Sequence, residues 1–179
     1  MQQLVLLTIF LLIIGLTFTI TKWKGGLHLT FSHHAARNRS SKIFYSLLFL
    51  ITLPILMWFF VAWFVPTNSL PRTFLWFAAI AVIFQIACTF VPEEGGRKTI
   101  IHRILAAISG IALLPLIVIV ATSTKLSTTV HNAAWIALLV MVTLLGIALS
   151  NQKGYRYALL LQIGYYTVFF TIILMATYL

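Results

Sequence analysis

The stretch of sequence that decides the fold joins two hydrophobic segments and reads VPEEGGRKTIIHRILAAISG, from Val91 to Gly110. Its acidic pair, Glu93 and Glu94, holds the only two carboxylate side chains of the chain. A pair of glycines and a group of basic residues follow, and His102 lies just inside the next apolar run. Because nearly all of the remaining sequence is hydrocarbon, we place every other feature relative to this stretch.

The overall composition excludes a soluble fold. Hydrophobic residues make up 61% of the 179 residues, charged residues make up 8%, and the mean hydropathy is +1.06. These values lie far outside the range of soluble globular proteins and indicate an integral membrane protein. The single cysteine, Cys88, cannot form a disulfide within the chain, and we expect it to be a small packing residue.

Six apolar runs are long enough to cross a bilayer, which takes about 20 residues in a helix. They cover residues 4–20, 43–65, 73–91, 100–121, 133–149 and 157–178. The connections between them are short, and no linker separates a second domain. The sequence therefore predicts one all-α domain, a polytopic integral membrane protein built as a bundle of six transmembrane helices.

The distribution of Lys and Arg predicts how the chain is oriented. The first, third and fifth connections between the spans hold nine of these residues, and Arg103, just inside the fourth span, adds a tenth on the same side. The second connection holds only Arg72 and the fourth only Lys125. By the positive-inside rule, the three basic connections lie in the cytoplasm and both termini lie outside. We therefore expect a multi-pass protein of the cell membrane, most simply the inner membrane of a bacterium.

The formal net charge of +10 raises the question of a nucleic-acid partner. We expect none, because the basic residues lie in short connections and form no folded patch of their own. The expected partner is the lipid bilayer, where Arg37, Arg39 and Lys42 would lie at anionic headgroups and each gain about 1 kcal/mol. Partner helices within the membrane are a second candidate.

The first connection contains signals for the start of a helix. Ser32 can accept a hydrogen bond from a free backbone N–H, and it precedes a run without Pro or Gly that extends to Leu53. We therefore expect a helix that begins at His33 in the cytoplasm and continues unbroken into the second span.

Pro54 and Pro115 fall in the middle of predicted spans. Each removes a backbone donor and frees a carbonyl group one turn earlier, so we expect helix kinks that face protein or a wet cavity. A structural kink is the favoured interpretation, and a hinge or the wall of a ligand cavity is the alternative.

Small residues predict close helix packing. Ala106 and Gly110 in the fourth span, and Gly146 and Ser150 in the fifth, are spaced so that two helix backbones can approach each other. This pattern favours a central position for the fourth span.

Few polar side chains lie inside the spans, and the main ones are Gln85, Gln162 and Ser109. No Asp, Glu, Lys or Arg lies near a midplane, which disfavours a proton-coupled carrier. We expect the two glutamines to bond to each other and hold helices together, with a bound ligand as the alternative. A continuous polar cavity that reaches either glutamine would instead favour a small permease.

The predicted cytoplasmic side gathers most of the titratable side chains. They are Glu93, Glu94, His102, His28, His33 and His34. We predict that they form a face for a ligand or a partner, with no catalytic residue and no cofactor. The alternatives are a metal site from His102, His33 and Glu93, or one haem between His102 and a histidine of the first connection.

The acidic turn favours a simpler interpretation. An exposed Glu93 or Glu94 can pair with Arg37, Arg39 or a protonated His33, which contributes about 0–1 kcal/mol. His102 would then pair with a glutamate or extend toward water.

Part of the opening stretch resembles a known family. The resemblance is to the F-P-x-D … H-x-x-A-A signature of bacterial domain-of-unknown-function family 998. In this chain the similar residues are FVPE, which begins at Phe90, and HRILAA, which begins at His102 after a short loop. The family is itself distantly similar to the Frag/DRAM/Sfk membrane proteins. The resemblance implies a six-helix membrane fold, with Pro92, Glu93 and His102 as motif residues and no known activity. Glu93 stands where the family often has Asp, and members with a basic N-terminus imply the opposite orientation.

These observations favour a non-enzymatic membrane protein that binds a lipid, another small apolar ligand or a partner. The first alternative is a histidine-based metal or haem enzyme at the cytoplasmic face. The second alternative is a small permease.

Overall fold

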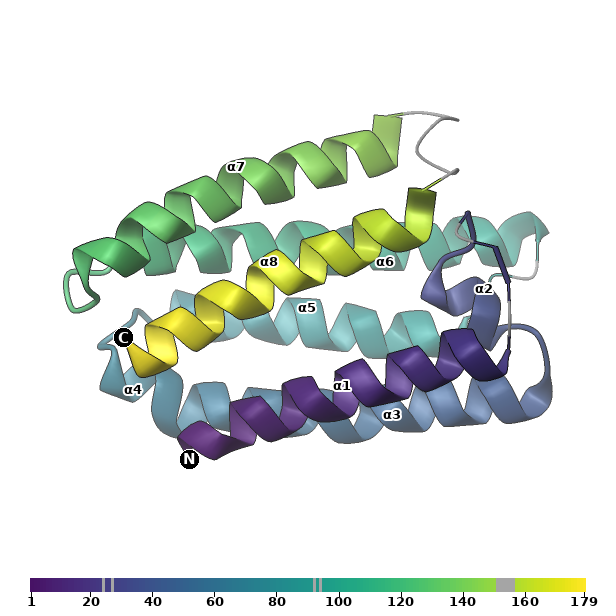
Figure 1. Cartoon of the computed structure of the whole chain (residues 1–179), viewed down its shortest axis with the longest axis horizontal. Helices are drawn as coiled ribbons and strands as arrows, with labels where there is room; N and C mark the ends of the chain where they lie inside the picture. The colour runs from purple at the N-terminus through teal and green to yellow at the C-terminus, as the bar shows by residue number, and fades with distance from the viewer. Residues whose placement is uncertain (24, 27, 92, 94, 151–156) are drawn as a thin grey trace.

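The computed structural model describes the whole chain except residues 24, 27, 92, 94 and 151–156. The described residues form helices and no strand (Figure 1). Six helical segments are long and apolar enough to cross a membrane. The predicted all-α membrane bundle is confirmed, since helices satisfy their backbone groups without water.

The six predicted spans all form, with ends within five residues of the predicted ones. The elements in chain order are α1 (Gln2–Lys22), α2 (Phe31–Ala35), α3 (Arg39–Phe59), η1 (Phe60–Phe64), α4 (Val65–Thr67), α5 (Thr73–Phe90), α6 (Gly96–Ala121), α7 (Thr128–Ser150) and α8 (Ala158–Tyr178). The second span consists of α3, η1 and α4 in direct succession. The short helix α2 lies in the first connection and spans nothing.

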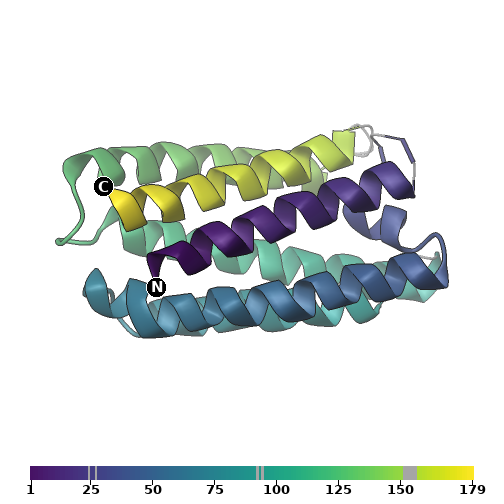
Figure 2. The same cartoon turned by 60° about the horizontal axis from the view of Figure 1, so that its bottom comes forward.

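The spans are arranged as a ring. α1 packs on α3, α3 on α5, α5 on α6, α6 on α7, α7 on α8, and α8 returns to α1 (Figures 1 and 2). α6 also contacts α8, but it is one member of the ring, so the predicted central position of the fourth span stays a prediction.

The two ends of the bundle differ in charge. Residues 23, 25, 26, 28–38, 91, 93 and 95 lie at one end, which we call the basic end (Figure 1). Both termini lie at the other end with residues 68–72 and 122–127, and we call this the opposite end. The predicted grouping is therefore present for the first four connections, and the fifth, at residues 151–156, lies outside the described residues. The side of the membrane on which each group lies stays a prediction.

The first connection folds differently from the prediction. Thr30, not Ser32, caps α2 by accepting a hydrogen bond from the backbone N–H of His33. A second helix start follows, where Asn38 and Ser41 form a reciprocal capping box at the start of α3. The predicted unbroken helix is wrong, because Asn38 has an extended backbone and satisfies the free N–H groups of a new helix.

Both prolines lie inside helices, as predicted. Pro115 is half-buried beside the fully buried Leu116. Pro54 is exposed on the outside of the bundle, because Leu53 and Leu56 occupy the buried face of α3. The prediction that Pro54 faces protein or a wet cavity is therefore wrong.

The small residues of α6 and α7 differ in their surroundings. Ser109 and Gly110 are buried, and a Cβ atom at Gly110 would lie 3.8 Å from Leu145 of α7. Gly146 is exposed, and a Cβ atom there would meet nothing within 4 Å. The predicted close packing is wrong at Gly146, because its face of α7 points outward. The side chain of Ser150 is not among those that the structure describes.

The orientation can be tested with single cysteines at Ser40, near the basic end, and at Thr124, at the opposite end, in a Cys88→Ala background. Both side chains are exposed. We expect a membrane-impermeant maleimide to label Thr124→Cys in intact cells and Ser40→Cys only after permeabilisation. Labelling of Ser40→Cys alone in intact cells would reverse the predicted orientation.

Candidate functional site

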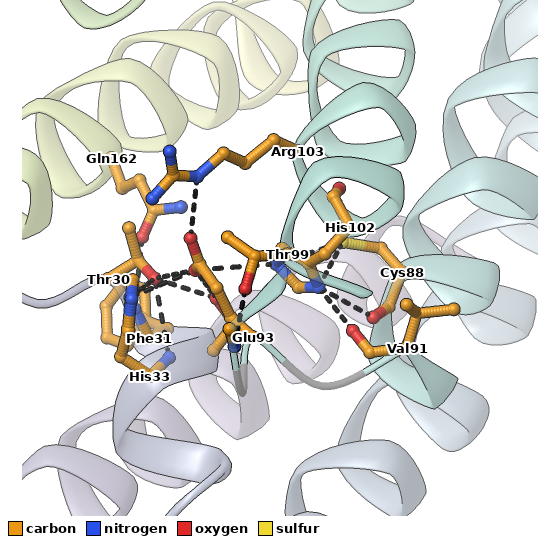
Figure 3. A network of polar contacts seen from close by, with 12 residues as sticks. Thr30, Phe31, His33, Cys88, Val91, Glu93, Thr99, His102, Arg103 and Gln162 are labelled. Carbon is orange, nitrogen blue, oxygen red and sulfur yellow. Dashed lines mark hydrogen bonds and ion pairs between the residues drawn. The ribbon is translucent and has the colours of Figure 1, made fainter. Parts of the chain in front are cut away.

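Glu93 is the centre of a polar cluster at the basic end (Figure 3). The residue is only 7% exposed. Arg103 Nε donates a hydrogen bond of 2.9 Å to Oε1, and His33 Nδ1 lies 2.9 Å from Oε2. One carboxylate therefore connects a side chain of α6 with a side chain of α2.

Two hydroxyl groups complete the surroundings of this carboxylate. Ser32 Oγ donates to Oε2 over 2.9 Å and Thr30 Oγ1 over 3.0 Å. Thr30 also caps α2, so the residues that begin this short helix are the ones that hold Glu93. The cluster thereby fastens α2 to the connection between α5 and α6.

The partners of Glu93 keep it ionised at neutral pH. Burial raises the pKa of this carboxyl group, but the bonds from His33, Arg103 and Ser32 outweigh burial and lower the pKa from 4.5 to about 2. Glu93 is therefore a fixed anion and is poorly suited to exchange protons near neutral pH.

His102 lies beside the cluster and points into the bundle (Figure 3). It is 5% exposed, and its Nδ1 lies 2.6 Å from the carbonyl oxygen of Val91. A carbonyl group only accepts, so Nδ1 carries the hydrogen and Nε2 is left facing Cys88 Sγ at 3.3 Å and Glu93 Oε2 at 3.9 Å. Of the two predicted arrangements, the approach of His102 to a glutamate is present at 3.9 Å from Glu93, and the extension toward water is not, because the ring binds the end of α5.

Cys88 is buried, as predicted, and lies against the His102 ring. A thiolate is the reactive form of cysteine, and apolar burial disfavours it. The pair therefore fits a packing role better than a nucleophilic one.

The structure brings together only part of the predicted histidine face. His33 and His102 both approach Glu93, at 2.9 Å and 3.9 Å. His28 is exposed. His34 is buried and turns toward a backbone carbonyl group of the first connection, 2.9 Å from its Nδ1.

The predicted exposed acidic turn is wrong for Glu93, which is buried. Its guanidinium partner is Arg103, whose Nε lies 2.9 Å from Oε1. Within the described part of the chain, neither Arg37 nor Arg39 forms an ion pair with this carboxylate. Glu94 lies outside the described residues.

Four members of the cluster were not predicted, namely Thr30, Ser32, Cys88 and Arg103. Thr30 and Ser32 stand directly before two adjacent histidines, and this density of short polar side chains is the signal that could have revealed them. The other two could not be found in this way, because their contacts depend on how α5 and α6 pack.

A metal site was one alternative for these residues. In the part of the chain that the structure describes, no three His, Cys, Asp or Glu side chains are grouped to hold a metal ion. His33 and Glu93 already bind each other. A metal or haem site at this cluster therefore stays a prediction.

A cavity of about 410 Å³ lies inside the ring, next to the cluster. Side chains of α1, α3, α5, α6 and α8 line it, and Phe31 and Ser32 of α2 lie at its basic end. Polar groups gather at this end, whereas Leu56 and Leu116 are typical of the lining farther along. The cavity is therefore amphipathic along its length.

All three predicted buried polar residues line this cavity. Gln85 Oε1 accepts from Tyr166 Oη at 3.3 Å and from Ser109 Oγ at 3.4 Å. Gln162 Oε1 accepts from the backbone N–H of Phe31 at 3.2 Å. The glutamines thus hold helices together, as predicted, but through other partners than each other.

The cavity opens on the side of the bundle between α1 and α8. Ile13 and Thr17 of α1 and Thr167 of α8 line it and are also exposed on the outside. Toward the opposite end, Gln2 Nε2 joins the two helices by donating to the carbonyl oxygen of Thr177 over 3.1 Å. The opening is therefore flanked by two membrane spans.

Comparisons with known proteins find no relative: no protein-family model, no curated protein and no solved structure matches the chain. The resemblance to family 998 therefore stays a prediction. The cluster and the cavity are the features that bear on function.

Replacing Glu93 by Gln should destabilise the basic end, because Arg103 and His33 lose their anionic partner. Hydrogen bonds to a charged group contribute about 2 kcal/mol, which corresponds to a melting temperature lower by roughly 4–8 °C. Thermal unfolding of the purified protein in detergent measures this change. Arg97→Gln, on the exposed first turn of α6, removes a charge at the same end and should have little effect. A Glu93→Gln variant as stable as the wild type would contradict the structural role.

The same pair of proteins should respond differently to acid. The folded pKa of Glu93 is lowered, so its contribution to stability is complete above about pH 4.5 and is lost as the pH falls through about 2. The difference in melting temperature between the wild type and Glu93→Gln should therefore shrink over this range. A difference that stays constant down to pH 2 would show that the charge of Glu93 is not its cause.

Proposed function

We propose that this protein binds a membrane amphiphile, a lipid or a similar apolar molecule, inside its ring of helices. The observation that carries the proposal is the amphipathic cavity, which has a polar end beside the Glu93 cluster and an apolar remainder. A volume of about 410 Å³ falls within the range of about 300–1,000 Å³ typical of small-molecule sites.

The length of the cavity suits a chain-like ligand. Its lining extends along α6 from His102 to Leu116. At 1.5 Å per residue this is about 21 Å, compared with about 30 Å for the hydrocarbon core of a bilayer. An extended alkyl chain can lie along this path, with its polar group at the basic end, near the membrane interface.

The bilayer is the best source of such a ligand. The opening between α1 and α8 lies between two spans, so an apolar molecule can pass from the membrane without crossing water. At the basic end, α2 covers the cavity with Phe31, whose backbone N–H is bound by Gln162. Glu93 holds this cover in place, which is a structural role and supports a non-enzymatic function.

The permease alternative has one supporting observation. The cavity reaches both Gln85 and Gln162, but most of its lining is apolar. A polar solute would lose its hydration there with few groups to replace it. The amphiphile is therefore the better candidate.

We place the protein in the cell membrane, as a multi-pass protein of the bacterial inner membrane, with anionic headgroups at its basic end. Its apolar spans and the predicted orientation support this location.

The proposal predicts that the protein, purified in dodecyl maltoside, retains a lipid-sized molecule that native mass spectrometry detects. Ala106→Leu adds bulk inside the cavity and should lower the occupied fraction severalfold. Ala148→Leu makes the same change on the exposed face of α7 and should leave occupancy unchanged. No bound molecule in the wild type, or equal occupancy in all three proteins, would refute the proposal. A Soret band or stoichiometric metal would instead favour the histidine-based alternative.

A further inference from the structure

We infer that the amphiphile carries an uncharged carbonyl group, and that Tyr45, Gln85 and Gln162 bind this group at the polar end of the cavity. The inference rests on the proposed function and specifies the ligand that the same cavity takes. It follows from the hydrogen-bonding groups that the fold leaves without partners there.

Tyr45 supplies the first of these groups. The residue is only 6% exposed and lines the cavity, yet its hydroxyl group has no hydrogen-bond partner within the described chain. Among the described residues the fully buried polar side-chain atoms without a partner are His34 Nε2 and His131 Nε2, so the Tyr45 hydroxyl group faces the open space of the cavity. Polar groups inside a protein are normally satisfied by protein, water or a ligand. A ligand in the cavity would supply the missing acceptor.

The glutamine side chains supply two more donors. Tyr166 and Phe31 occupy the amide oxygens of Gln85 and Gln162, respectively. The amide nitrogens have no hydrogen-bond partner among the residues that the structure places. Because the oxygens already accept, the free capacity of both side chains is donation.

These donors lie at a similar depth in the membrane. Ser46, next to Tyr45, donates to the carbonyl oxygen of Thr89 over 3.3 Å, which aligns this part of α3 with the end of α5. Gln85 lies about one helical turn before Thr89 on α5. Tyr166 binds Gln85 and lies one turn after Gln162 on α8, so all three helices present their donors near the same level.

The charge of the cavity selects the kind of acceptor. No Lys, Arg, Asp or Glu among the described residues lines the cavity. Glu93, which lies nearby, is already neutralised by Arg103 and by bonds from α2. Burying a carboxylate or an ammonium group without a counter-ion is very costly. An uncharged carbonyl oxygen accepts two hydrogen bonds at no such cost, and both esters and quinones provide one.

A matched pair of ligands tests this inference. Monopalmitoylglycerol and its ether analogue hexadecylglycerol share chain and headgroup and differ in the carbonyl group. Binding is measured by titration of the delipidated protein in dodecyl maltoside, a detergent without a carbonyl group. We expect the ester to bind roughly 2- to 10-fold more tightly than the ether, the gain of one or two neutral hydrogen bonds.

Variants show which residues cause the difference in affinity between the ester and the ether. Tyr45→Phe, Gln85→Leu and Gln162→Leu should each lower the ratio of ester affinity to ether affinity. Tyr45→Phe breaks no hydrogen bond within the described chain and should leave the affinity for the ether nearly unchanged, whereas the two glutamine variants also break bonds between helices and are judged by the ratio alone. Retained ether binding also shows that a variant is folded. Tyr178→Phe, at the opposite end, removes a hydroxyl group outside the cavity and should preserve the preference.

The remaining ligands separate the sources of the carbonyl group. Tighter binding of decylubiquinone than of monopalmitoylglycerol would identify a quinone, and the reverse would identify an acyl ester. Tightest binding of palmitate would overturn the inference, because its carboxylate is charged. Equal binding of ester and ether, with no effect of Tyr45→Phe, would also overturn it but leave the proposed function intact. Failure of every long-chain compound to bind would refute both.

Discussion

The ionised Glu93 carboxylate, buried at the end of a hydrocarbon bundle, is the constraint on which the arrangement of the basic end depends. A buried anion is tolerated only when it is fully bound. Here the donors come from α6 and from the start of α2. The connection after α5 can therefore take its place only if α2 folds back across the end of the ring.

This constraint gives the two polar regions of the molecule different characters. In the Glu93 cluster, donors from the protein itself satisfy the carboxylate, and these bonds hold α2 to the connection between α5 and α6. In the cavity, Tyr45 and the two glutamines have donors without a partner in the described chain, and these donors are the basis of the proposed ligand site. The cover formed by α2 separates these regions, since Ser32 contacts Glu93 on one side and lines the cavity on the other.

The fold was largely predictable from sequence, because a membrane span must be a long apolar helix whatever its neighbours. Glu93, His33 and His102 were identified as a group because ionisable side chains are rare in this mostly apolar sequence. The burial of Glu93, its bond to Arg103 and the break before Asn38 were not predicted. They depend on which helix faces meet, and a local pattern does not contain that information. The exposed Pro54 shows the same limit, since sequence marks a proline but not the face it occupies.

The ring is closed by its first and last helices. Gln2 and Thr177, which form one of the bonds between α1 and α8, are 175 residues apart in the chain. α8 also supplies Gln162 and Tyr166 to the cavity wall. Without α8, the other five spans would leave this side of the cavity open along its whole length, because α8 supplies one wall and the bond to α1. The cavity therefore has its shape only when the two ends of the sequence have come together.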